Sequence, residues 1–146
     1  MNTIVPLISS GVAGPLGVLH LPRLWLKSSL EACGKLAPGY PGCGKGYDSM
    51  VLGAIGLDQA VFQAFIKSKK PTYPELEEWI KKQPGAKLDK STIDTLNSSI
   101  RGYIHTDDVR KTVLSANSMQ DDGSIRDAIN LNNLDDWKEF HSAVLK

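Results

Sequence analysis

Glycine and proline are distributed so unevenly that they divide this chain into two parts. Of the 13 glycines and eight prolines among its 146 residues, eight glycines and five prolines fall within the first 46 residues. Such a density excludes a long helix or an interior strand, because glycine favours no single backbone conformation and proline lacks the N–H donor. The front third therefore predicts an extended arm over residues 1–19, apolar enough to lie on the core, and a loop over residues 37–47.

Helical patterns fill the rest of the chain. Apolar residues recur at helical spacing between cap-like starts and stops, and no segment alternates as a surface strand would. The predicted helices cover residues 21–36, 48–54, 89–104, 107–116 and 134–145, two stretches that follow Asp58 and Thr72, and a short turn capped by Ser124 or Asp127. The residues expected to face inward include Tyr103, Val109, Trp137 and Val144. The sequence thus predicts an all-α fold, a compact bundle of six to eight short helices in one domain over residues 1–146.

The charge balance limits the partners that the chain can have. Its 17 basic and 16 acidic residues give a net charge of +1, which excludes the broad positive field of a nucleic-acid or anionic-membrane binder. The apolar amino-terminal stretch lacks the basic region of a signal peptide, and no stretch approaches the ~20 apolar residues of a membrane helix. We expect a soluble, cytoplasmic protein with no nucleic-acid and no membrane partner.

The loop at residues 39–46 comes close to a phosphate-binding loop. Such a loop ends in Lys followed by Ser or Thr and follows a strand, whereas here Gly46 follows Lys45 and a helix precedes the loop. Nucleotide hydrolysis is therefore disfavoured. The same loop gathers Tyr40, Cys43, Lys45, Tyr47 and Asp48 on a backbone whose glycines allow close approach to a ligand. A rigid connector between helices is the alternative.

Arg23 and Lys27 lie four residues apart, on one face of the first predicted helix and near its start. Like charges at this spacing repel each other, and a cation near a helix amino terminus opposes the helix dipole. An anion would relieve this strain. Asp48 is one internal candidate, in a structural Arg–Asp pair, and a ligand carboxylate or phosphate is another.

The cysteines and histidines give weaker signals. Cys43 is a candidate nucleophile if Lys45 lowers the pKa of its thiol, although a partly buried structural thiol fits equally, and a bridge to Cys33 stays open. His105, Asp107 and Asp108 suggest a metal site, but Thr106-Asp107-Asp108 is also an ordinary helix start. His20 and His141 are isolated in the sequence. We expect no metal site and no cofactor.

Several short motifs together carry a resemblance to a known family. They are Leu21-Pro22-Arg23 with Lys27, then Tyr40, Cys43 and Asp48, then Gly56-Leu57-Asp58, and then Trp79. In this combination the chain resembles a bacterial family of small uncharacterised proteins, the domain-of-unknown-function family numbered 5069. The resemblance implies no reaction. It implies a shared cluster of Arg23, Lys27, Tyr40, Cys43 and Asp48.

These observations lead to a hypothesis of a binding site. We expect a small anionic molecule to lie between the first helix and the Gly/Pro-rich loop, with Arg23, Lys27 and Lys45 supplying charge-assisted hydrogen bonds. Tyr40 and Tyr47 would wall the pocket, and Asp48 would orient Arg23 or act as a base in acid–base or biosynthetic accessory chemistry. The alternative is a non-enzymatic interaction or oligomerisation module that uses an exposed apolar patch, with the amino-terminal arm docking onto a partner or onto a second copy of the chain.

Overall fold

Helices account for all the regular structure in residues 2–146, the part of the chain that this computed structural model describes. Their bounds are α1 Leu21–Ala32, α2 Tyr47–Ile55, α3 Gln59–Lys69, α4 Tyr73–Lys81, α5 Lys90–Gly102, α6 Asp107–Ala116, α7 Ala128–Phe140 and a π-helical turn, η1, His141–Leu145. Within these residues only isolated β-bridges occur and no sheet is formed. The all-α prediction is therefore confirmed.

Side-chain caps explain why most of these helices begin where they do. The residue before each of α3 to α7 accepts a hydrogen bond from the backbone N–H three residues along, and these five caps are Asp58, Thr72, Asp89, Thr106 and Asp127. A side-chain acceptor satisfies one of the backbone donors that a helix start leaves free. At α4 a full capping box is present, since Glu75 also accepts from the Thr72 N–H.

The last helix differs from its prediction. It starts at Ala128 and not at Leu134, because Asp127 caps it and Ala128 and Leu131 are fully buried. The predicted inward face is also wrong for Trp137 and Val144, which are 58% and 61% exposed.

One further helix boundary and the inward orientation of two further residues were predicted wrongly. Helix α1 ends at Ala32, four residues early, because Gly34 takes a left-handed conformation with φ of 71° that ends the helix. Tyr103 and Val109 are each 40% exposed and do not face inward. Tyr103 is the residue after α5, where the backbone turns away from the helix.

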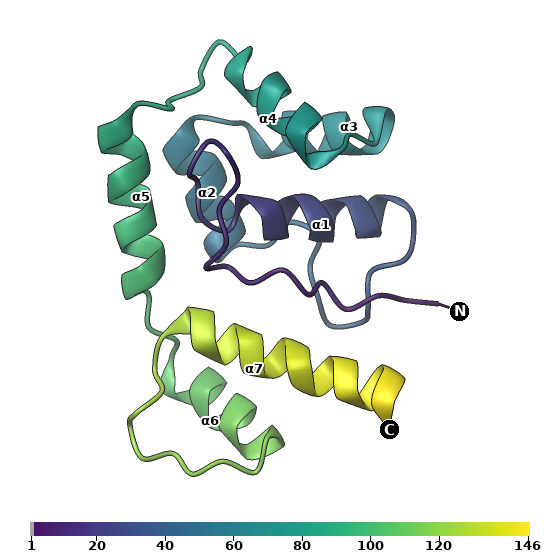
Figure 1. Cartoon of the computed structure of the whole chain (residues 1–146), viewed down its shortest axis with the longest axis vertical. Coiled ribbons are helices and arrows are strands. Elements are labelled where there is room, and N and C mark those ends of the chain that lie inside the picture. The colour runs from purple at the N-terminus through teal and green to yellow at the C-terminus, as the bar shows by residue number, and fades with distance from the viewer. Residues whose placement is uncertain (1) are drawn as a thin grey trace.

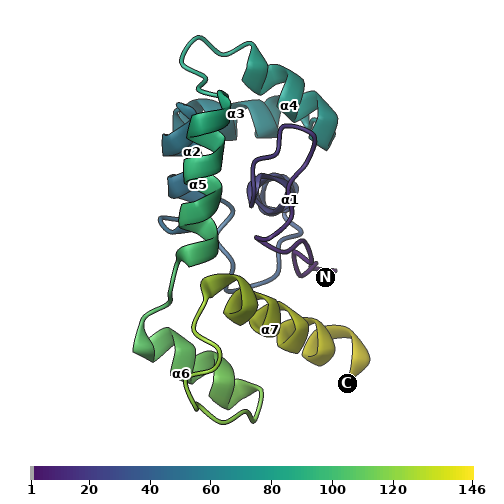
Figure 2. The ribbon, with the colours of Figure 1, turned by 60° about the vertical axis from the view of Figure 1, so that its left-hand side comes forward.

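The apolar core is divided into two clusters. The main core lies among α1 to α5 and includes the fully buried side chains of Leu24, Val51, Phe62, Leu76 and Ile100. A small separate cluster of Val113, Leu114 and Leu131 joins α6 to α7. In Figures 1 and 2, α6 and α7 lie side by side at one end of the molecule, while α3 and α4 lie at the other.

The amino-terminal segment is partly extended and partly folded back. Ile4 pairs with residues 35–37, its N–H donating to the Lys35 carbonyl at 2.7 Å. From Ser9 to His20 the chain instead turns back on itself, and the His20 N–H donates to the Val12 carbonyl at 3.1 Å. Figure 1 shows the beginning of this segment running between α1 and α7. It therefore brings backbone carbonyls to the start of α1.

The helices are short. In residues 2–146 none is by itself long and apolar enough to cross a membrane, and only α2 and α3 together, bent by 99°, have the necessary length and composition.

Candidate functional site

A cavity of about 280 Å³ lies where the start of α1, the loop at residues 39–46, the start of α2 and helix α7 meet. We call it the loop cavity. Six of the predicted site residues line it: Arg23, Lys27, Tyr40, Lys45, Tyr47 and Asp48. Cys43, the seventh, does not. The cavity is also lined by His20, Tyr103, His105, Asn132 and Asp135, which sequence reasoning missed.

At the back of the loop cavity, Asp48 binds Lys27 of α1 and His20 of the turn before α1. Its Oδ2 accepts from Lys27 Nζ at 2.6 Å and from the Gly44 N–H at 2.7 Å, and its Oδ1 lies 2.5 Å from His20 Nε2. His20, Lys27 and Asp48 are each less than 7% exposed. A buried charge is stable only when it is paired and hydrogen-bonded, and here each group meets this condition.

The protonation states of this cluster follow from its contacts. Burial opposes the ionisation of Asp48, but the hydrogen bond from His20 and the charge of Lys27 outweigh it and lower the pKa to about 2. Burial lowers the pKa of His20, so its imidazole is neutral. Since ionised Asp48 only accepts hydrogen bonds, His20 Nε2 carries the proton and Nδ1 accepts from the Ser10 hydroxyl at 2.8 Å. Both ring nitrogens are therefore occupied.

Ser10, His20 and Asp48 resemble a catalytic triad in composition only. Ser10 is fully buried and does not line the loop cavity, so its hydroxyl cannot reach a substrate. Ser10 and Asp48 instead hold the side chain of His20, whose backbone is strained with a φ of 71°.

Arg23 pairs with a residue that the sequence analysis did not consider. Its guanidinium donates to both carboxylate oxygens of Asp136 on α7, at 2.6 and 3.0 Å, and to the carbonyls of Pro6 and Ile8. The predicted pairing of Arg23 with Asp48 is wrong, because Lys27, His20 and the Gly44 N–H already occupy Asp48. Tyr40 joins the pair by donating its hydroxyl to Asp136 at 3.0 Å.

Aromatic rings form one side of the loop cavity. His20, Tyr47, Tyr103 and His105 follow one another with ring centroids 5.2, 5.3 and 6.0 Å apart. The Tyr47 hydroxyl donates to the Ile100 carbonyl at 2.6 Å, so it is not free for a ligand. We call these four residues the aromatic wall. Within the aromatic wall, His20 is the most buried ring, at 2% exposed, and Tyr103 is the most exposed, at 40%.

The chemistry predicted for Cys43 is not supported. Burial first, and then the charge of Asp48, raise the pKa of its thiol to about 11. A thiol is a nucleophile only as the thiolate, so Cys43 is a structural residue in this environment. Cys33 and Cys43 are both free, so the bridge left open by the sequence is not formed.

The residues around His105 form a helix start. Thr106 caps α6, and Asp107 pairs with Arg110 at 2.7 Å. His105 Nε2 meets Asn132 Oδ1 at 3.0 Å. Within residues 2–146 no three His, Cys, Asp or Glu side chains gather as a metal site would require.

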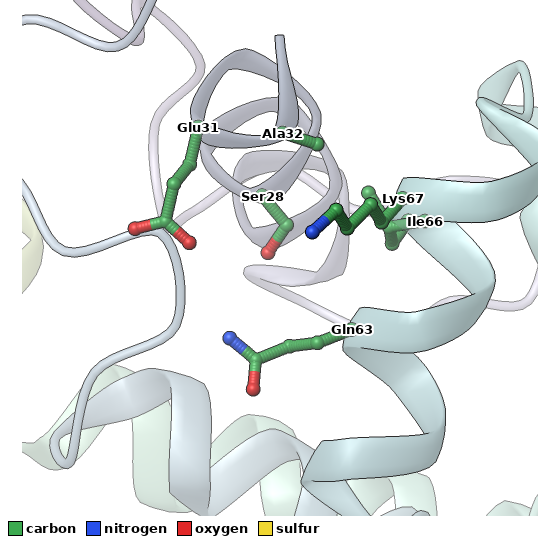
Figure 3. A pocket seen from close by; sticks show the side chains of 6 residues that line it. All are labelled: Ser28, Glu31, Ala32, Gln63, Ile66 and Lys67. Atoms are coloured by element: carbon green, nitrogen blue, oxygen red, sulfur yellow. The ribbon is translucent and has the colours of Figure 1, made fainter. Parts of the chain in front are cut away.

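A second cavity, of about 260 Å³, lies between α1 and α3. Figure 3 shows Ser28 and Glu31 of α1 across it from Gln63 and Lys67 of α3. The two polar groups of α1 already hold the loop, since Ser28 donates to the Gly42 carbonyl and Glu31 accepts from the Gly42 N–H. Ser28 and Glu31 therefore anchor the loop at residues 39–46, which lines the loop cavity.

Comparisons of the chain with protein-family models, curated proteins and solved structures find no match. The resemblance drawn from the sequence motifs therefore stays a prediction.

Proposed function

We propose that the loop cavity binds a small anionic molecule. The observation that carries the proposal is that three cations and two tyrosines, predicted separately from two stretches of sequence, line one cavity: Arg23, Lys27, Lys45, Tyr40 and Tyr47. Concave sites with a few convergent polar groups are where small molecules ordinarily bind.

Two lysines that line the loop cavity have donors left for an anion. Arg23 and Lys27 are paired, but Lys27 Nζ makes one hydrogen bond within residues 2–146 and carries three donors. Lys45 is exposed and takes part in no ion pair within residues 2–146. Gly46 offers no side-chain cap at the start of α2, but the ionised Asp48 in the first turn offsets the positive potential there. The attraction for an anion therefore comes from Lys27 and Lys45.

The hydrogen bonds favour binding over acid–base catalysis at the back of the cavity. Asp48 is already occupied by three donors and its pKa is low, so it is a poor base at neutral pH. His20 has both nitrogens engaged. We propose a cytoplasmic binding domain, and on the sequence motifs a member of the bacterial family that it resembles.

Replacing Lys45 with alanine tests the proposal. We expect a phosphate monoester, either phenyl phosphate or ribose 5-phosphate, to raise the melting temperature of the parent protein and to bind about fivefold more weakly to K45A. This change corresponds to roughly 1 kcal/mol. The variant should fold normally, since Lys45 is exposed and unpaired. Isothermal titration calorimetry measures the affinities.

The matched control is Lys111→Ala, which removes an exposed lysine from α6, away from the cavity. It should bind like the parent protein. The proposal is wrong if neither the monoesters nor a carboxylate such as glucuronate bind, or if K45A and K111A bind the anion equally well.

The alternative, an interaction module, has one observation in its favour. An apolar hollow of about 450 Å³ lies beside the amino-terminal segment and is lined by Leu7, Val12, Pro22 and Trp137. Light scattering distinguishes the two functions, because a homodimer through this hollow gives a mass that rises with concentration and falls in Trp137→Ser. Deleting the amino-terminal segment would be a poor test, since its carbonyls hold Arg23.

A further inference from the structure

Two polar groups in the loop cavity are left over by the contacts described above. Asp135 is partly buried and makes no hydrogen bond or ion pair within residues 2–146. Asn132 uses its Oδ1 for His105, and its amide NH₂ donates no hydrogen bond within the described residues. The two residues are three positions apart on α7, so their side chains lie on one face of that helix.

An unpaired carboxylate beside an unpaired amide has a specific complement. The carboxylate only accepts hydrogen bonds and the NH₂ group only donates them, whereas a hydroxyl does both. Neighbouring hydroxyl groups on a ligand would therefore satisfy Asp135 and Asn132 together. An anionic group would be repelled from Asp135, so it belongs on the other side of the cavity, near Lys27 and Lys45.

The aromatic wall adds a surface for a ring. Tyr103 presents the most exposed ring of the wall, and its neighbours Tyr47 and His105 hold it in place. The face of an aromatic ring is apolar and carries negative potential, so it packs well against the C–H groups of a sugar ring. The volume of about 280 Å³ is slightly below the range of roughly 300–1,000 Å³ for drug-sized ligands, and it suits one ring.

We propose that the ligand is a hydroxylated single-ring compound with one anionic group, either a monosaccharide phosphate or a sugar acid. Its ring lies against Tyr103, its hydroxyls meet Asp135 and Asn132, and its anionic group meets Lys27 and Lys45. This inference rests on the proposed anion-binding function, and it adds the class of molecule that carries the anion.

Calorimetry on the full chain with four probes tests the inference. Ribose 5-phosphate and glucuronate carry the hydroxylated ring with the two kinds of anion, phenyl phosphate carries a flat ring without hydroxyls, and inorganic phosphate carries no ring. We expect one of the first two to bind at least tenfold more tightly than phenyl phosphate and inorganic phosphate. Which of them does so identifies the anion as phosphate or carboxylate.

The variant Asp135→Asn separates the role of the carboxylate from the charge of the site. It should weaken the hydroxylated probe about tenfold, because the charged acceptor is lost. It should leave phenyl phosphate unchanged or bind it more tightly, because a negative charge near the anion is removed. Within residues 2–146 Asp135 makes no hydrogen bond or ion pair that its replacement would break, so D135N should fold, and its melting temperature checks this.

Glu139→Gln is the matched control. It removes the same charge from the same helix, one turn along, but Glu139 is exposed and does not line the loop cavity. Both kinds of probe should bind E139Q as they bind the parent protein. If phenyl phosphate binds as tightly as the sugar probes, or D135N weakens all probes alike, this inference is wrong and anion binding stands. If no probe binds, the proposed function fails and the inference fails with it.

Discussion

Asp48 links three separate parts of the chain at the back of the loop cavity. It lies at the amino terminus of α2, neutralises Lys27, fixes the tautomer of His20 and holds the loop through Gly44. Removing one partner of such a buried pair leaves the other charge uncompensated, which costs about 3–5 kcal/mol in other proteins. The geometry at the back of the cavity therefore depends on this carboxylate remaining ionised.

The protein should lose stability in acid in two steps. The pKa of His20 is lowered by burial from 6.5, so below that pH the unfolded chain binds a proton that the folded one does not. The pKa of Asp48 is lowered from 3.8 to about 2, so between these pH values the unfolded chain again binds a proton that the folded one does not. Stability falls with falling pH wherever the unfolded state binds more protons. The Asp48 step should amount to about 2 kcal/mol, and urea denaturation from pH 8 to pH 2.5 measures it.

The variant His20→Asn identifies the upper step. Asparagine tolerates the left-handed backbone of residue 20 better than most residues, and it does not titrate. The free energy of unfolding of H20N should therefore change less between pH 7 and pH 5 than that of the parent protein. Equal changes in the two proteins would contradict the assignment of this step to His20.

Helix α7 carries Asn132, Asp135 and Asp136, and Asp127 caps its start. Asp127→Ala removes the acceptor of the Asn130 N–H, which lies at 2.9 Å. We expect a loss of about 1 kcal/mol in the free energy of unfolding, measured by urea denaturation.

Asp94→Ala is the control for this variant. Asp94 is an exposed residue inside α5 that pairs with Lys90 on the surface, and such a pair contributes little. An equal loss in D127A and D94A would show that the cap has no special role.

Element starts were readable from the sequence because caps act locally. Thr72 with Glu75, and Asp58, Asp89 and Thr106, each act on a backbone group three residues away, so the signal and its effect lie in one short window. Arg23 and Lys27 near the start of α1 were likewise identified from a local feature, their spacing of four residues. The start of α7 was misplaced although Asp127 precedes it, because the asparagines that follow are poor helix formers and only the burial of Ala128 and Leu131 compensates for them.

The partners inside the site could not be read from the sequence because they depend on the tertiary fold. Arg23 and Asp136 are 113 residues apart, and nothing local marks Asp136 as different from Asp135 beside it. His20 looked isolated because its partners, Ser10 and Asp48, come from a turned-back segment and a different helix.

At the scale of the whole molecule, the two clusters of apolar side chains should differ in stability. The cluster between α6 and α7 has three buried residues, Val113, Leu114 and Leu131, whereas the main core joins α1 to α5 and also includes Ala128 of α7. Stability against local opening follows the amount of apolar contact. The amides of α6 should therefore exchange with solvent through a smaller opening than those of α2.

Native-state hydrogen exchange in low concentrations of urea measures both openings. We expect the free energy of opening for α6 to fall clearly below the global value, while that of α2 matches it. If the two helices open with one free energy, the molecule is a single cooperative unit and the smaller cluster is as stable as the larger one.

The contact between Arg23 and Asp136 also sets the order in which the protein can be completed during synthesis. When Arg23 is made, Pro6 and Ile8 are already present, but its carboxylate partner follows 113 residues later. Until α7 emerges, the guanidinium has two carbonyl acceptors and no counter-charge. Contacts between distant parts of a chain form slowly, so the loop cavity is completed only after α7 has been made.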